Sequence, residues 1–259
     1  IRGGVHTPVA HDSARAHVTG AAHFVDDHPT VPGTLETALV LSPHAHARIV
    51  AVDVSRALAA PGVAAIIAAT DIPGRNDIAP IRSDEPLLPA DIVSYDGQPV
   101  VAIAADTLDH ARAAATLVDI TSEPLPALLA IEDAVTQEHS VSAPQIMARG
   151  DLAGGFAAAA HRLNGELRCG GQDHFYLEGQ IALATPLDNG DLHVLSSTQH
   201  PTEVQHAVAR LLGLPMAAVT AEVRRMGGAF GGKESQATLI AGIAAVLAWK
   251  ARRPVKLRL

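Results

Sequence analysis

Short apolar stretches alternate with alanine-rich amphipathic stretches along the first half of the chain. Apolar residues run together, as they do in strands, at 36–41, 63–68, 99–104 and 117–121. Between them, residues 55–60 and 107–115 have a helical composition. Pro61 and Gly62 end the first of these helices, because proline cannot continue a helix and glycine suits the position after its end. Strands that alternate with helices of this length predict an α/β sheet unit.

Two stretches rich in turn-forming residues interrupt this alternation. Residues 74–97 concentrate glycine, proline, asparagine, aspartate and serine, and they predict a long loop. Residues 123–150 contain Pro124, Pro126 and Pro144. This second break is the best candidate for a domain boundary.

The last third of the chain has a sharper pattern. Residues 192–197 and 219–225 predict strands, and Thr202 and Gln205 have the spacing of a capping box that opens a helix. Residues 235–252 predict a second, longer helix that Pro254 ends before another strand. Each helix has apolar positions on one face, namely Val204, Val208, Leu211 and Leu212 in the first and Leu239, Ile240, Ile243, Val246 and Leu247 in the second. The glycine-rich stretch 226–234 therefore precedes the N-terminus of a helix.

Composition narrows the class of protein. With 259 residues, of which 48% are apolar, the chain can bury the core of one large domain or two ordinary ones. Its net charge of -8 argues against nucleic acid or an anionic membrane as a partner. The single cysteine, Cys169, allows no intrachain disulfide and cannot hold an iron–sulfur cluster, and we expect a buried, inert thiol. No apolar run is long enough to span a membrane, and we expect a cytoplasmic location.

The glycine-rich stretch "MGGAFGGKE" at 226–234 has the spacing of a phosphate-binding loop with one residue changed. Gly227, Gly232 and Lys233 fit G-x-x-x-x-G-K, but Glu234 stands where a serine or threonine would hold Mg²⁺. A carboxylate there would repel phosphates, which argues against an NTPase. Glycines followed by a helix still let the backbone approach an anion closely. A glycine-rich turn with a purely structural role is the alternative.

Three further stretches accompany this one. Taken with "GGQDHFYLEGQ" (170–180), "SSTQHPTEVQH" (196–206) and the N-terminal "HDSARAHVTGAAHFVDD" (11–27), the loop region "RRMGGAFGGKESQ" (224–236) closely resembles the molybdenum-cofactor subunit of the xanthine dehydrogenase family. The resemblance implies an α+β fold with a tail at 1–10, an a/b hammerhead domain at 11–123, a linker at 124–145 and the first part of a molybdopterin-binding domain at 146–259. Residues 174–178 would support the cofactor from behind.

The resemblance also implies roles for individual residues. Gln199 is similar to the glutamine that hydrogen-bonds near the apical ligand of molybdenum, without a direct bond to the metal. Gly228, Phe230 and Gly231 would approach the cofactor, and Glu234 would bind a purine. His200 would line the pocket beside them. The family has glycine where this chain has Ala229, which matters only if that position needs a positive φ.

The implied activity is the oxidation of hypoxanthine or xanthine to urate. Molybdenum–molybdopterin would lie on this chain, whereas iron–sulfur clusters and FAD would lie on partner domains or subunits that pass electrons to NAD. The implied partners are the remainder of the molybdenum subunit and an iron–sulfur/FAD subunit, in a hetero-oligomer. The family's arginine opposite Glu234 and its glutamate base would follow Leu259, so residues 1–259 alone are expected to be inactive. Two alternatives stay open: a hydroxylase of aldehydes or other N-heterocycles, and a non-catalytic binding or assembly module.

Overall fold

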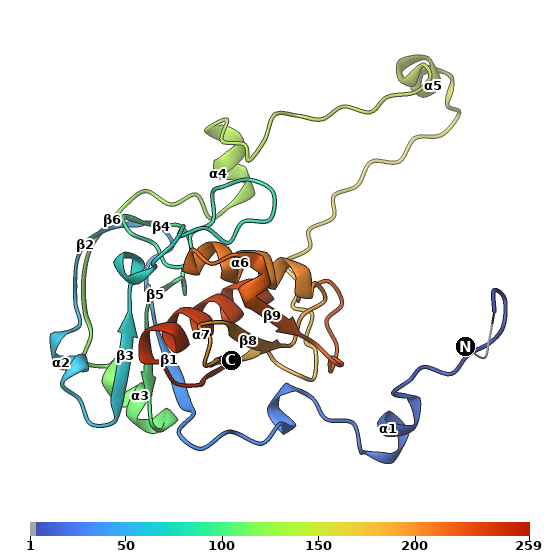
Figure 1. The fold of residues 1–259 in the computed structure, drawn as a ribbon. Helices are drawn as coiled ribbons and strands as arrows, with labels where there is room; N and C mark the ends of the chain where they lie inside the picture. Colours follow the sequence, from blue (N-terminus) through green and yellow to red (C-terminus); the bar gives the residue numbers. More distant parts are fainter. Residues whose placement is uncertain (1–3) are drawn as a thin grey trace. The chain divides into compact units, whose positions relative to one another are not determined.

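The computed structural model describes residues 4–259, and the chain divides into two units (Figure 1). The first unit runs to Leu125 and resumes at His174–Leu259, and the second is Pro126–Asp173. The strands of the first unit are β1 (Leu35–Leu41), β2 (Ala47–Asp53), β3 (Val63–Ile67), β4 (Ile92–Val93), β5 (Pro99–Ala105), β6 (Asp119–Pro124), β7 (Ile181–Pro186), β8 (Leu192–Ser196), β9 (Val219–Glu222) and β10 (Val255–Arg258). Its helices are α1 (Ala14–Thr19), α2 (Ser55–Leu58), α3 (Leu108–Ala115), α6 (Pro201–Leu212) and α7 (Ala237–Ala251), with short 3₁₀ turns at Val25–Asp27, Ala69–Asp71 and Met216–Ala218.

A seven-stranded mixed sheet organises the first unit, in the order β3-β5-β1-β10-β7-β8-β9. β1 pairs with β10 in parallel, and β8 with β9 in parallel, while the other neighbours are antiparallel. All seven residues of β5 are buried, as expected for a strand that is covered on both faces. Strands from the first and last thirds of the chain therefore share one sheet. A smaller sheet, β4-β2-β6, completes the unit.

Helices α6 and α7 lie side by side, and α7 packs on the large sheet (Figure 1). The sequence predicted one buried face for α7, but almost the whole helix is buried because it lies between α6 and the sheet. It begins at Ala237, two residues later than predicted. Helix α6 begins at Pro201 with His200 as N-cap and has no side-chain cap, so the expected capping box from Thr202 is wrong. Gly213 ends α6 in the left-handed conformation, which suits glycine.

The second unit contains the short helices α4 (Ile131–Thr136) and α5 (Leu152–Ala158). The Asp151 carboxylate caps α5 by accepting from the N–H of Gly154 at 2.9 Å. Most side chains of this second unit are exposed. Cys169 is among the exposed ones, so the expectation of a buried thiol is wrong. Among residues 4–259, no helix is both long and apolar enough to cross a membrane.

Candidate functional site

The glycine-rich segment forms a loop between β9 and α7, as the sequence predicted. Gly231 has φ 91°, a conformation that suits glycine, and Phe230 has φ 54° with its side chain 76% exposed. Ala229 is buried and is not among the residues with positive φ, so its methyl group meets no conformational penalty. The strain in this loop falls on Phe230 instead, since a bulky residue in this region of φ is an outlier.

Gln199, which follows β8, holds the loop through its side chain. Its Oε1 accepts from the N–H of Gly231 at 3.1 Å and from the N–H of Lys233 at 3.3 Å, while its own backbone N–H donates to the Lys233 carbonyl at 2.8 Å. Because both N–H groups need an acceptor, the oxygen of the amide must face the loop. The Nε2 donors are then left pointing elsewhere, and none of the described residues accepts from them.

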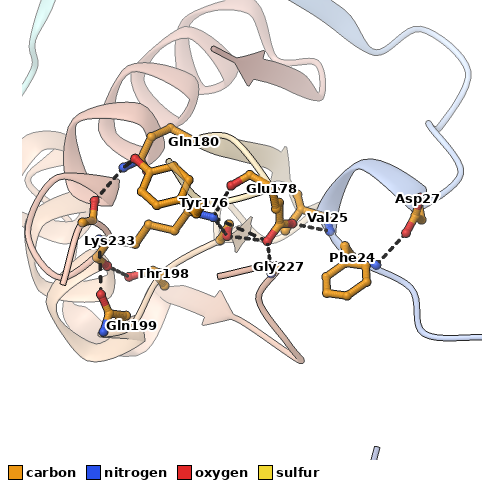
Figure 2. Close-up of polar contacts among 12 residues, drawn as sticks. Phe24, Val25, Asp27, Tyr176, Glu178, Gln180, Thr198, Gln199, Gly227 and Lys233 are labelled. Atoms are coloured by element: carbon orange, nitrogen blue, oxygen red, sulfur yellow. Dashed lines mark hydrogen bonds and ion pairs between the residues drawn. The ribbon is translucent and has the colours of Figure 1, made fainter. Parts of the chain in front are cut away.

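Lys233 points away from the loop surface and is completely buried (Figure 2). Its Nζ donates to the Glu178 carbonyl at 2.6 Å and to Ser197 Oγ at 2.7 Å, and it lies 4.5 Å from the centre of the Tyr176 ring. Burial lowers the pKa of Lys233, although the nearby carboxylate of Glu178 opposes this shift. A lysine held in this way cannot reach a phosphate over the loop, so the geometry rules out the phosphate-binding role that the spacing suggested.

Glu178 joins three separate segments from behind the loop (Figure 2). One carboxylate oxygen accepts from the N–H of Gly227 at 2.8 Å and from the Ser197 hydroxyl at 2.7 Å and lies 3.6 Å from Lys233 Nζ. The other oxygen accepts from the N–H of Val25 at 3.2 Å. A Cβ added to Gly227 would lie 2.5 Å from that of Glu178, so this approach requires glycine. The segment 174–178 thus supports the loop.

A cavity of about 470 Å³ opens beside the loop and brings several predicted residues together. Its lining comprises Pro80, Ile81, Gln199, His200, Glu203, Glu234 and Ser235. His200 Nδ1 lies 2.8 Å from Glu203 Oε2, which fixes the orientation of the imidazole at the cavity wall. Glu234 is exposed and lies two residues before Gln236, the N-cap of α7, so it precedes the first turn of the helix.

The donors around this loop suit an electron-rich group. The backbone N–H groups of Gly228, Ala229 and Phe230 donate to no described residue, and neither does Gln199 Nε2. Such preorganised donors stabilise oxo or phosphate oxygens. The residues present therefore fit a cofactor that carries acceptor oxygens.

Sequence reasoning placed Glu178 in the supporting segment 174–178 and Lys233 in the glycine-rich loop, but it missed the contact between these two side chains and the part played by Glu203. Glu178 and Lys233 are far apart in sequence, and nothing in the residues around either one shows that their side chains meet in the fold. The signal for Glu203 was its position three residues after His200, which places both side chains at the start of one helix.

Comparisons with known proteins match two family models to successive parts of the chain. A model of the aldehyde oxidase and xanthine dehydrogenase a/b hammerhead domain matches residues 19–126, and a model of the molybdopterin cofactor-binding domain matches residues 135–259. The xanthine dehydrogenase of Oryza sativa subsp. japonica is 43% identical in an alignment of 254 positions that covers 96% of this chain and 19% of that protein.

Solved structures show the same fold. Quinoline 2-oxidoreductase from Pseudomonas putida 86 has a TM-score of 0.80 at 28% identity, covering 98% of this chain and 34% of that one. Aldehyde oxidoreductase from Desulfovibrio gigas has a TM-score of 0.76 at 28% identity, covering 96% of this chain and 29% of that one. The chain spans only a part of these relatives, and it covers 19% of the length of the Oryza sativa xanthine dehydrogenase. It belongs to the aldehyde oxidase and xanthine dehydrogenase family and carries the a/b hammerhead domain followed by residues of the molybdopterin cofactor-binding domain.

Proposed function

We propose that this chain forms one wall of the active site of a xanthine dehydrogenase, a molybdenum hydroxylase that oxidises hypoxanthine and xanthine. The observation that carries the proposal is the orientation of Gln199: its oxygen is occupied by the loop, so its amide donors are free for a cofactor ligand. Glu234 lines the same cavity and is free to bind a substrate. The similarity to the rice xanthine dehydrogenase supports a purine as that substrate.

In this proposal the residues of the chain position the purine and stabilise the bound cofactor. The bound molybdenum–molybdopterin cofactor supplies the oxidising chemistry. Gln199 Nε2 and the backbone from Gly228 to Gly231 would hold the bound cofactor, with the glutamine amide as a hydrogen-bond donor. The Glu234 carboxylate accepts from a purine N–H and so orients the ring. His200, held by Glu203 through Nδ1, lines the cavity beside Glu234.

The remaining parts of the proposed enzyme lie outside this chain. Iron–sulfur clusters and FAD on partner domains or a partner subunit carry electrons to NAD, and the whole protein acts in the cytoplasm as a hetero-oligomer. We also propose domain limits of 11–123 for the hammerhead domain and 146–259 for the molybdopterin-binding part.

The second candidate substrates are an aldehyde or an N-heterocycle other than a purine. The two structural neighbours are named for quinoline and for aldehydes, at 28% identity each. Assays of the full-length protein with hypoxanthine, quinoline and a simple aldehyde, beside molybdenum and pterin analysis, separate these possibilities. We expect stoichiometric molybdenum and the highest kcat/KM for the purine. A metal-free protein would contradict the proposal and favour a non-catalytic module, and preference for the aldehyde would contradict the purine assignment.

A further inference from the structure

The loop that follows the 3₁₀ turn Ala69–Asp71 is tied to the C-terminal end of helix α6. The N–H of Gly74 donates to the Leu211 carbonyl at 2.7 Å, and the N–H of Arg75 donates to the Arg210 carbonyl at 2.9 Å. A Cβ added to Gly74 would lie 2.2 Å from the Arg210 carbonyl oxygen, so the close approach of the two backbones needs glycine. These bonds fix where the loop leaves the helix.

Asp77 extends this attachment through side chains. It is 5% exposed, and its Oδ2 accepts from the Ser83 hydroxyl at 2.6 Å and from Arg210 Nη1 at 3.3 Å. The same Arg210 nitrogen also donates to the Ala79 carbonyl at 3.3 Å, and the N–H of Ala79 donates to Asp77 Oδ1 at 3.1 Å. Arg75, whose side chain is largely exposed, forms a second ion pair with Asp77, with its Nη2 3.4 Å from Oδ2. The turn from 77 to 83 is thus closed around one carboxylate and one guanidinium.

The ionised state of Asp77 follows from these partners. Burial acts to raise the pKa of Asp77, but the Ser83 hydroxyl, the Ala79 N–H and the two guanidinium groups outweigh it and lower the pKa below its ordinary value. Since Arg210 stays charged and the pKa of Asp77 is lowered, both partners are ionised at neutral pH.

The turn that this pair closes borders the candidate active-site cavity. Pro80 and Ile81 follow Ala79 directly, and both line the cavity with Gln199 and Glu234. Ile81 is 93% exposed, and Pro80 is its only apolar companion in that lining. Helix α6 begins at the cavity with His200 as N-cap and carries Arg210 in its last turn. One rigid helix therefore sets both the polar wall of the cavity and the anchor of its apolar wall.

We propose that Asp77 and Arg210 are positioning residues that hold the 79–83 turn, with Ile81, at a fixed distance from Glu234 and so set the width of the cavity available to a substrate ring. Neither side chain lines the cavity itself. The inference rests on the proposed function, because it treats this cavity as the substrate site. If the pair only stabilised the fold, its loss would lower stability without changing which substrate is preferred.

The test uses the full-length, cofactor-loaded protein with the variants Arg210→Met and Asp77→Asn. The probes are hypoxanthine and phenanthridine, a three-ring N-heterocycle. We expect the ratio of kcat/KM for hypoxanthine over phenanthridine to fall about 10-fold, mainly through a higher KM for hypoxanthine, because loss of one close apolar contact costs on this scale. Arg210→Lys, which keeps a charge near Asp77, should restore part of the ratio.

A second readout follows the loop itself. Hydrogen exchange of residues 78–86 should quicken in both variants, and the exposed Arg56→Met should change neither exchange nor the ratio. The Ile81 side chain is exposed, so Ile81→Ala should leave the fold intact. This variant should lower the hypoxanthine-to-phenanthridine ratio of kcat/KM without faster hydrogen exchange of the loop. Faster exchange with an unchanged ratio overturns this inference and leaves the proposed function standing. A wild-type enzyme that oxidises neither probe contradicts the proposed function, and this inference with it.

Discussion

Gln199 Oε1 accepts a hydrogen bond from the backbone N–H of Gly231 at 3.1 Å, which links the end of β8 to the loop before α7. This bond orients both partners. It holds Gly231 in its left-handed conformation, and it leaves the Nε2 donors of Gln199 without a partner among residues 4–259. One glutamine thus has two separable roles, as an anchor of the loop and as a donor toward whatever lies above it.

Replacement of Gln199 by glutamate separates these two roles. A carboxylate still accepts from Gly231 and Lys233, but it has no N–H to donate. We expect Gln199→Glu to preserve slow hydrogen exchange in the loop and to lower kcat by about 10- to 100-fold for every substrate alike. Gln199→Ala should lose both the protection and the activity. Full activity of the glutamate variant would contradict the donor role.

Glu178 and Lys233 should respond unequally to loss of charge. Glu178→Gln leaves a fully buried ammonium group with only neutral partners, which should cost about 3–5 kcal/mol. Lys233→Met leaves a carboxylate that still accepts from Gly227, Ser197 and Val25, so the cost should be about 1–3 kcal/mol. Native-state hydrogen exchange at Gly227 measures both opening energies. A larger effect of Lys233→Met would show that the carboxylate depends on the lysine.

Two neighbouring loop positions should differ in their tolerance of a methyl group. Gly231 has φ 91°, and an added Cβ would meet only His174, at an ordinary contact distance of 3.9 Å, so Gly231→Ala should destabilise the loop by about 1–2 kcal/mol through backbone strain alone. Ala229→Gly is the matched control, because Ala229 is not among the residues with positive φ. Exchange rates of the loop amides and molybdenum content give the comparison. Equal effects of both changes would refute the conformational explanation.

The sequence predicted local features better than long-range ones. Apolar runs predicted β5 and β8 correctly, because nearly all side chains of these strands are buried. The glycines predicted the loop correctly, because several glycines between a strand and a helix are typical of a loop. The pairing of β1 with β10 was beyond the sequence, since it joins Leu35 to Val255 and depends on the whole sheet. Helix α7 begins at Ala237, after a tight turn in which the N–H of Thr238 donates to the Ser235 carbonyl at 3.0 Å, and the sequence pattern did not show this turn.

The resemblance of short stretches added what periodicity lacked. It groups Gln199, His200 and Glu234, and the cavity brings these three together. Their roles toward cofactor and purine stay predictions.

In the proposed function Glu234 binds the purine, while Gln199 and the glycine-rich loop face the molybdenum cofactor. The most direct measurement is purine kinetics of Glu234→Ala in the full-length protein, with molybdenum content determined on the same sample. The control is Glu222→Ala, an exposed carboxylate at the end of β9 that pairs with His193 outside the cavity. A hydrogen bond to a charged group is worth about 1.5–3 kcal/mol, so kcat/KM for hypoxanthine should fall about 10- to 100-fold at unchanged molybdenum content. Unchanged kinetics at full metal occupancy would contradict the account.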